Sequence, residues 1–269
     1  MPELQFRAQN RQRGKMEIRN QTETKAQLNI YGDIVSDKWG KWSDDDTCPT
    51  DISDFLKDLD GVSEIEMHIN SGGGSVFAGI AIYNMLKRSK ATVTTYIDGI
   101  AASIASVIAC AGDRIVIPKN GTFMIHKPTT GYFLESLNAD ELRKDADTLD
   151  HCQKSIVQTY MERARDGVTE QEINDLVNEE TWMSGSEAAE YFDFEVEEDV
   201  NAAACASELF NFYKNTPENV KKQENPTISA EKIADMVIER LESRKQAEEQ
   251  KKTEDIKKEI LEDLDMYGI

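Results

Sequence analysis

The chain has 269 residues, of which 39% are apolar, so it can bury the core of one good-sized domain and still carry appendages. Its 51 acidic and 31 basic residues give a formal net charge of −20. This charge argues against nucleic acid or an anionic membrane as a partner, because phosphate contacts need clustered lysine and arginine. Residues 1–15 lack the apolar core of a signal peptide, and the longest apolar run, 100–111, is too short to cross a bilayer. A cytosol-like compartment is therefore expected.

The cysteines and histidines give no sign of a metal site. The chain has three histidines and four cysteines, with no CxxC pair. Wide spacing in a reducing compartment indicates free thiols. We therefore expect no metal ion and no cofactor. The cysteines are Cys48, Cys110, Cys152 and Cys205.

The apolar residues are concentrated in one stretch, which predicts three parts. Residues 1–24 are polar and are expected to form a flexible N-terminal segment. Residues 25–205 are expected to form the folded domain. Residues 206–269 are rich in Glu, Lys, Asp and Gln, and are expected to form a charged, partly helical tail.

Strand and helix patterns alternate along the first half of the domain. Period-two alternation predicts strands, and apolar spacing of three and four predicts helices. The order β-α-β-α-β-α-β-β predicts an α/β layer with crossover helices and a largely parallel sheet. The expected strands cover 26–35, 63–70, 91–97, 113–118 and 121–128, and the expected helices cover 51–60, 76–90 and 100–111.

The second half is predicted to be mainly helical. An apolar seam predicts one long helix from about Glu135 to Arg165. Two capping boxes, in which a hydroxyl is followed three residues later by a glutamate, each predict the start of a further helix. They are formed by Thr169 with Glu172 and by Ser184 with Glu187.

Two serines, Ser103 and Ser106, lie in the apolar run "GIAASIASVIACAG". A turn at 98–99 places the start of the helix near residue 100 or 101, so Ser103 falls in its first turn. Unpaired amides and the helix dipole at that position could hold an oxyanion, whereas Ser106 lies a turn deeper. A serine in an alanine-rich helix is more often a packing residue, so other elements must decide between the two interpretations.

Two further elements point to a site. The run "NSGGGS" around residues 72–74 suggests a turn where something approaches the main chain closely, because three glycines are unfavourable in backbone entropy. No GxxxxGK[ST] phosphate loop is present. His126 ends a strand just before Pro128, at the sheet edge where sites of open α/β folds form. His126 is therefore a candidate general base for Ser103.

Four segments, "INSGGGSVFAGIAIYNML", "GIAASIASVIACAG", "FMIHKP" and "ETWMSGSEAAEYF", resemble the Clp protease proteolytic subunit (ClpP) family in sequence and order. The resemblance covers roughly residues 28–197. It implies a crotonase-like ββα fold with a long handle helix and a Ser-His-Asp peptidase activity. It implies Ser103 as the nucleophile, His126 as the general base, and the amides of Gly74 and Ile104 as the oxyanion hole. It also implies that the glycine segment pairs with substrate peptides, through residues Gly72, Gly73, Ser75 and Val76.

The chain departs from the family pattern at three positions. Gly72 replaces the usual proline of the glycine segment, and Phe192 replaces a glycine, so the helix before it must end differently. Glu180 stands where the family has its aspartate. Because glutamate is one methylene longer, Glu179 and Asp175 remain alternatives for the acid.

A narrower resemblance points to the ClpP-related head maturation proteases of tailed phages, through "IYGDI", "ETWM" and the acidic tail. It implies cleavage of scaffold and capsid proteins, in the host cytoplasm or inside the assembling prohead. Protein or peptide substrates and a homo-oligomeric ring, in which the long helix meets its counterpart, are expected. The alternatives are a housekeeping subunit that works with an AAA+ ATPase, a catalytically silent assembly scaffold, and an acyl-CoA enzyme of the same fold.

Overall fold

The computed structural model describes residues 24–59, 61–131, 136–198, 205 and 207–221. The chain divides into two compact units, residues 1–223 and 224–269, and the fold described below belongs to the first. Nearly all of the predicted N-terminal segment and most of the predicted tail lie outside the described residues. The predicted domain boundary at residue 205 therefore stays a prediction.

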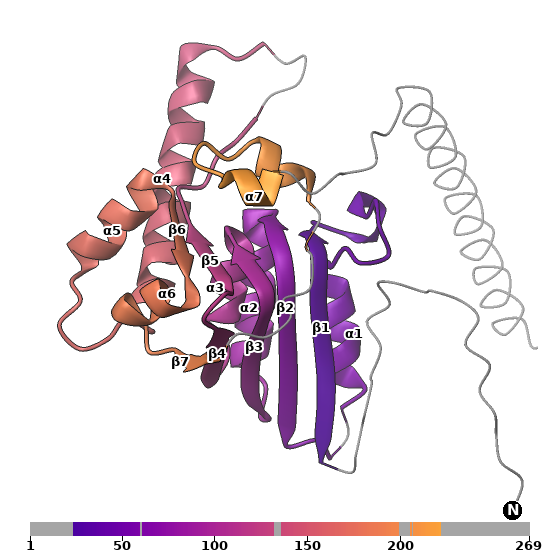
Figure 1. Ribbon diagram of the computed structural model, residues 1–269. Coiled ribbons are helices and arrows are strands. Elements are labelled where there is room, and N and C mark those ends of the chain that lie inside the picture. Colours follow the sequence, from indigo (N-terminus) through magenta and orange to yellow (C-terminus); the bar gives the residue numbers. More distant parts are fainter. Residues whose placement is uncertain (1–23, 60, 132–135, 199–204, 206, 222–269) are drawn as a thin grey trace, which may run out of the picture. The chain divides into compact units, whose positions relative to one another are not determined.

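The first unit is built on a largely parallel sheet, as the pattern predicts (Figure 1). Four parallel strands follow one another in chain order, a short strand β7 pairs with the fourth, and β5 pairs with the end of β3. Strand β6 is antiparallel to β5. The strands are β1 (Lys25–Ile34), β2 (Glu64–Gly74), β3 (Thr92–Ala102), β4 (Arg114–Pro118), β5 (Thr122–Ile125), β6 (Thr181–Ser184) and β7 (Glu195–Glu197).

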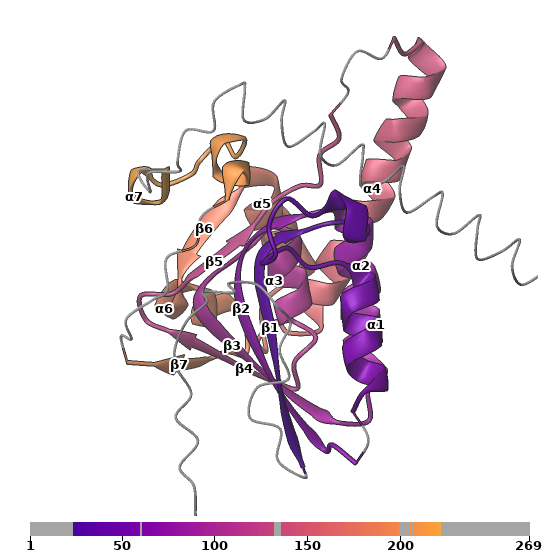
Figure 2. The same ribbon diagram turned by 90° about the vertical axis from the view of Figure 1, so that its right-hand side faces the viewer.

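Three helices, α1 (Pro49–Lys57), α2 (Val76–Lys87) and α3 (Ile104–Ala109), lie against one face of this sheet (Figure 2). Side chains along β2 alternate between buried and partly exposed, which explains why the helices cover one face of the sheet. Ile65 and Met67 are fully buried towards the helices, whereas His68 is only partly buried on the other face. The core therefore lies between the sheet and the helices.

The long helix α4 (Ala139–Met161) is shorter than predicted, because Asn138 caps its first amides and ends the preceding segment. Its buried residues all lie in its C-terminal half, while Leu142 is 50% exposed. Figure 2 shows the N-terminal half of α4 extending past the sheet. The predicted apolar seam is therefore only partly covered within one chain.

Both predicted capping boxes are present. Thr169 and Glu172 open α5 (Glu170–Glu179), and Ser184 and Glu187 open α6 (Gly185–Tyr191). Phe192, the residue after α6, takes extended backbone and is fully buried. The side chain that replaces the family's glycine thus fills the core.

Two predictions about local structure are wrong. Strand β3 runs on through Ala102, because residues 100–102 pair with β5, and the helix begins only at Ile104. Ser103 is therefore the residue before the helix and not part of its first turn. The predicted glycine turn is also wrong, because β2 continues to Gly74 and pairs there with Ile34 of β1.

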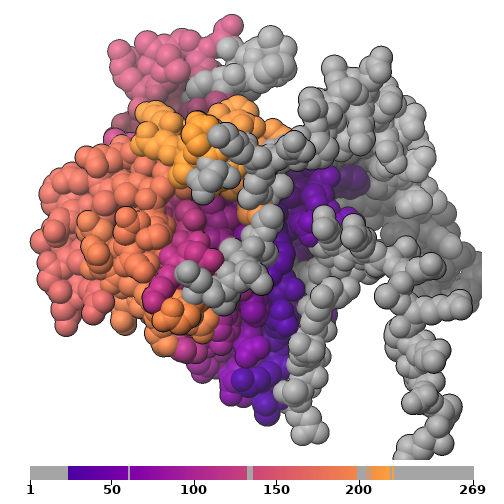
Figure 3. Space-filling model, viewed as in Figure 1, coloured from indigo at the N-terminus to yellow at the C-terminus, as the bar shows by residue number. Residues whose placement is uncertain are grey.

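A segment beyond the predicted domain packs on this unit. Residues 207–221 include the short helices η2 (Glu208–Asn211) and α7 (Glu218–Lys221). In Figures 1 and 3 this orange segment lies over the ends of β2 and β3. Phe210 is buried there against Ile100, Ala102 and Met124.

The state of the cysteines agrees with the prediction. The four cysteines are free thiols, and all four are buried. Within the described ranges, none of the helices combines the length and apolar character that a membrane crossing requires.

Candidate active site

Ser103 occupies a strained elbow between β3 and α3. Its backbone has φ 55° and ψ −127°, a conformation that costs a non-glycine residue about 1–3 kcal/mol. The Ser103 amide donates to the Met124 carbonyl at 2.9 Å, which fixes the elbow to β5. A Cβ on Gly73, whose φ is +104°, would lie 2.7 Å from the Ser103 Cβ. The close approach of this elbow therefore requires a glycine at position 73.

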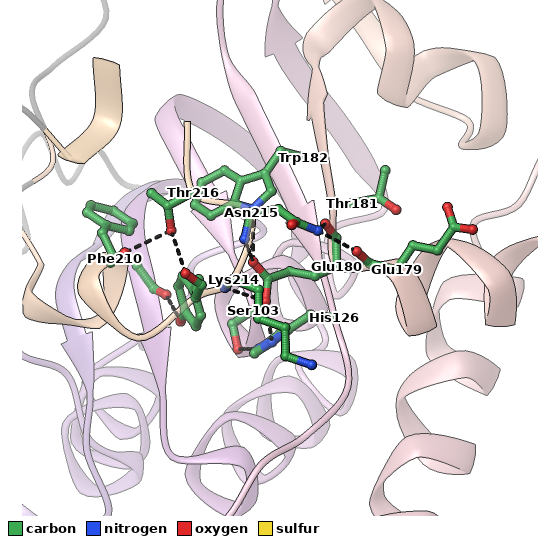
Figure 4. A network of polar contacts seen from close by, with 12 residues as sticks. Ser103, His126, Glu179, Glu180, Thr181, Trp182, Phe210, Lys214, Asn215 and Thr216 are labelled. Carbon is green, nitrogen blue, oxygen red and sulfur yellow. Dashed lines mark hydrogen bonds and ion pairs between the residues drawn. The ribbon is translucent and has the colours of Figure 1, made fainter. Parts of the chain in front are cut away.

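His126 lies beside the elbow because of strand register. Ala102 of β3 pairs with Met124 of β5, so the residues that follow the two strands come together. The Ser103 Oγ and the His126 Nε2 are 2.7 Å apart (Figure 4). The His126 side chain is 11% exposed. Burial lowers its pKa below the usual 6.5, opposed by the negative charge of Glu180. The imidazole is therefore neutral at pH 7 and can accept a proton from the hydroxyl.

Glu180 reaches His126 from the neighbouring strand. It ends α5 in the left-handed region with φ 54°, and the next residue, Thr181, pairs with Ile125 in β6 and β5. Its Oε2 lies 4.0 Å from the His126 Nδ1, which is beyond a direct hydrogen bond.

The Glu180 carboxylate instead accepts hydrogen bonds from the 214–215 backbone. The amide of Lys214 donates to Oε2 at 3.0 Å, and the amide of Asn215 donates to Oε1 at 2.6 Å (Figure 4). The Trp182 indole lies 3.4 Å from Oε1. These donors hold a carboxylate whose side chain is only 9% exposed.

The two alternative acids are placed differently. The Asp175 carboxylate accepts a hydrogen bond from Gln171 within α5, and Glu179 is exposed. Among the residues that the structure describes, the ion pair of His126 is with Glu180. This geometry favours Glu180 over Asp175 and Glu179, and its role stays a prediction.

The residues expected to bind substrate surround the elbow. Gly72 and Gly73 are buried at the end of β2, and the Gly72 carbonyl accepts a hydrogen bond from the Tyr213 hydroxyl at 2.6 Å. Gly74 ends β2 with φ +141°, where a Cβ would lie 2.1 Å from the Ile34 carbonyl oxygen. Only glycine fits this position.

The other three residues predicted to bind the oxyanion or the substrate lie at helix starts. Ile104 is the first residue of α3, whose first-turn amides have no carbonyl partner within the helix. Ser75 caps α2 through its hydroxyl, and Val76 begins that helix and packs on the core. The oxyanion and substrate roles of these residues stay predictions.

Ser106, the other serine of the run, has a different environment. It is fully buried, and its hydroxyl contacts the Tyr160 hydroxyl at 2.7 Å and the Ser103 carbonyl. These contacts indicate a structural role. In the described ranges, no cluster of three or more His, Cys, Asp or Glu side chains could hold a metal ion.

Sequence reasoning missed the contribution of residues 207–216. The signal was the run "LFNFY", residues 209–213, an apolar and aromatic patch in an otherwise charged tail. Tyr213 lies edge-on to the His126 ring with centroids 4.9 Å apart, and it also contacts Trp182 and Phe210. These aromatic residues belong to the surroundings of the candidate site.

Comparison with known proteins agrees with this architecture. The model of the Clp protease family matches residues 50–192, which is more than half of the chain. The chain belongs to the Clp protease family. A solved structure of a mutant ClpP1 from Listeria monocytogenes matches with a TM-score of 0.53 and 25% identity, over 65% of this chain and 93% of that one. The predicted ClpP-like fold is confirmed.

The curated Clp relatives match only part of this chain and only part of their own length. The ATP-dependent Clp protease proteolytic subunit 1 of Chlamydia abortus is 36% identical over 46% of this chain and 64% of its own length. The corresponding subunit of Leuconostoc citreum is 44% identical over 29% of this chain and 40% of its own length. The chain thus spans less than two thirds of the length of these Clp relatives.

Proposed function

We propose that this chain is a serine endopeptidase of the ClpP type. The observation that carries the proposal is the 2.7 Å contact between the Ser103 Oγ and the Nε2 of a buried, neutral His126. A strained strand-to-helix elbow presents the hydroxyl, as a nucleophile requires. The relatives are named as proteolytic subunits of Clp proteases, which supports the same activity.

The proposed mechanism follows from this geometry. The Ser103 Oγ attacks the peptide carbonyl carbon while the His126 Nε2 takes its proton, and the amides of Gly74 and Ile104 hold the oxyanion. His126 then gives the proton to the departing amine, which leaves an acyl ester on Ser103. Water activated by His126 hydrolyses this ester. Glu180 stabilises the imidazolium once its carboxylate approaches Nδ1.

The substrates that we propose are scaffold and capsid proteins during phage head maturation. The segments "IYGDI" and "ETWM" and the long acidic tail support this role. The names of the relatives favour a second candidate, a housekeeping subunit served by an AAA+ ATPase. Cleavage of a purified scaffold protein by the purified chain without ATPase or ATP supports the first role. A strict need for both supports the second.

A homo-oligomeric ring is part of the proposal. Leu142 is 50% exposed on the half of α4 that extends past the sheet, so this part of the predicted seam is left uncovered by the described part of one chain. Packing of this helix against a second copy would bury it. A monodisperse monomer with full peptidase activity in light scattering would contradict the ring.

The activity is tested with a fluorophosphonate probe and a fluorogenic peptide. Ser103→Ala and His126→Ala should each lower peptide cleavage by about 10⁴- to 10⁶-fold, because the two residues act as a unit. His68→Ala is the matched control, since His68 pairs with Asp98 on the far side of the sheet. Equal loss in all three variants, or labelling of Ser106, would refute the assignment. Absence of any labelling favours the silent scaffold.

A further inference from the structure

We propose that residues 207–216 form an inhibitory strap that fills the substrate groove of their own chain, so that the catalytic centre is closed until the strap is displaced. The inference rests on the proposed peptidase function. Three sets of contacts carry it: at the backbone of the glycine segment, in an apolar cluster, and at the Glu180 carboxylate.

The first contact blocks the edge where a substrate backbone would pair. A peptide that adds as a strand needs free main-chain acceptors and donors along the glycine segment. The Tyr213 hydroxyl already donates to the Gly72 carbonyl at 2.6 Å. A Cβ on Gly72 would meet the Ser207 hydroxyl at 2.6 Å, so the strap also covers the other side of this residue. Ser207 is fixed in turn by its hydrogen bond to Asp33 at 2.7 Å.

The second contact fills the space next to the nucleophile. The Tyr213 ring packs edge-on to His126. Its hydroxyl lies close to the elbow, because a Cβ on Gly73 would be 3.2 Å from the Tyr213 hydroxyl and 2.7 Å from the Ser103 Cβ. Phe210 is 4% exposed and lies against Ile100 and Met124. Apolar pockets with a few polar groups are typical of substrate sites. Here the chain's own aromatic side chains, Phe210 and Tyr213, pack into the apolar cluster next to the site.

The third contact holds the acid away from the base. The amides of Lys214 and Asn215 bind the Glu180 carboxylate, and the Asn215 side chain donates to the Glu179 carbonyl at 2.7 Å. With these donors in place the carboxylate stays 4.0 Å from the His126 Nδ1. Loss of the strap would free the carboxylate to approach the imidazole. The same movement would therefore open the groove and complete the triad.

The strap can be tested in the full-length protein. Tyr213→Ala removes the hydroxyl and the ring from the groove, and should raise the rate of fluorophosphonate labelling of Ser103 and of peptide cleavage about 10- to 100-fold. Tyr213→Phe removes only the hydrogen bond to Gly72 and should give a rise of about two- to tenfold. Phe212→Ala is the matched control, because that ring is 79% exposed in the same segment, and its rate should not change.

A synthetic peptide with the sequence of residues 207–216 should slow labelling of the Tyr213→Ala variant again. Ser103→Ala sets the zero of each assay, and circular dichroism checks the fold. If both Tyr213 variants fold and label Ser103 no faster than the wild type does, the inhibitory strap alone is overturned. Absence of Ser103 labelling in every variant overturns the strap and the proposed function together.

Discussion

Replacing the buried serine that is not the proposed nucleophile should affect stability and spare the chemistry. Ser106 and Tyr160 are 0% and 1% exposed, and their hydroxyls are 2.7 Å apart. The Ser106 hydroxyl also donates to the Ser103 carbonyl. Since a hydroxyl has one proton, Tyr160 must donate to Ser106 when Ser106 donates to Ser103. Ser106→Ala then leaves the Tyr160 proton buried without an acceptor.

The size of the effect follows from this asymmetry. A buried donor left unsatisfied costs about 1–3 kcal/mol. Tyr160→Phe removes the donor itself and leaves Ser106 bonded to Ser103, so it should cost only about 0.5–1.5 kcal/mol. For a domain of about 150–250 residues, 1 kcal/mol lowers Tm by roughly 2–4 °C. Ser106→Ala should therefore lower Tm by about 2–12 °C, and the double variant by less than the sum of the two single variants.

Thermal unfolding of the three variants, followed by circular dichroism, measures these differences, and fluorophosphonate labelling at 25 °C measures the site. Ser106→Ala should keep most of the labelling, since the Ser103 carbonyl still accepts the Ser106 amide at 3.0 Å. An unchanged Tm in Ser106→Ala, or additive effects in the double variant, would refute the hydrogen-bond chain. Loss of labelling with an intact fold would refute the separation of the two serines.

Three further predictions concern the site and the tail. Glu180→Gln should lower turnover, though by less than Ser103→Ala, because the acid stabilises the imidazolium without reacting; Glu179→Gln, on the exposed neighbour, should be fully active in the same peptide assay. The kcat/KM should be flat near pH 7 and should fall only as the pH drops through the lowered pKa of His126, below about 6.5. Stability should also decline below about pH 6.5, because His126 takes up its proton more readily in the unfolded chain than in the folded one. A midpoint of the kcat/KM profile above pH 7 would contradict this prediction. Removal of residues 222–269 should leave folding and peptide cleavage intact in circular dichroism and peptide assays, but reduce incorporation into proheads; unfolding would show that the tail belongs to the core.

The sequence predicts the order of elements because that order depends on local patterns. Strand alternation, helical spacing and capping boxes all act within a few residues, and the parallel sheet follows from their order. The proximity of Ser103 and His126 could also be predicted, since both follow strands of one parallel sheet. The strained backbone conformation of Ser103, and its place before the helix, could not be predicted from the neighbouring residues. The extension of β3 to Ala102 depends on pairing with β5, which begins only at Thr122.

The surroundings of Glu180 were beyond sequence reasoning for the same reason. Its position at the family's aspartate is visible in "EETWMS", but its two backbone hydrogen-bond donors, Lys214 and Asn215, lie more than thirty residues further along the chain. Aromatic residues in a charged stretch indicate that the stretch packs against an apolar surface, but the sequence does not show which surface, because that depends on the tertiary fold. The strap was therefore missed although its sequence stood out.

The strap's position in the chain has a consequence for how the site would be regulated. It lies outside residues 50–192, the part of the chain that matches the family model. A segment tethered to its own groove competes at an effective concentration of about millimolar, as short flexible linkers do. A substrate at lower concentration must then bind much more tightly than the strap, or meet a chain whose strap has been displaced.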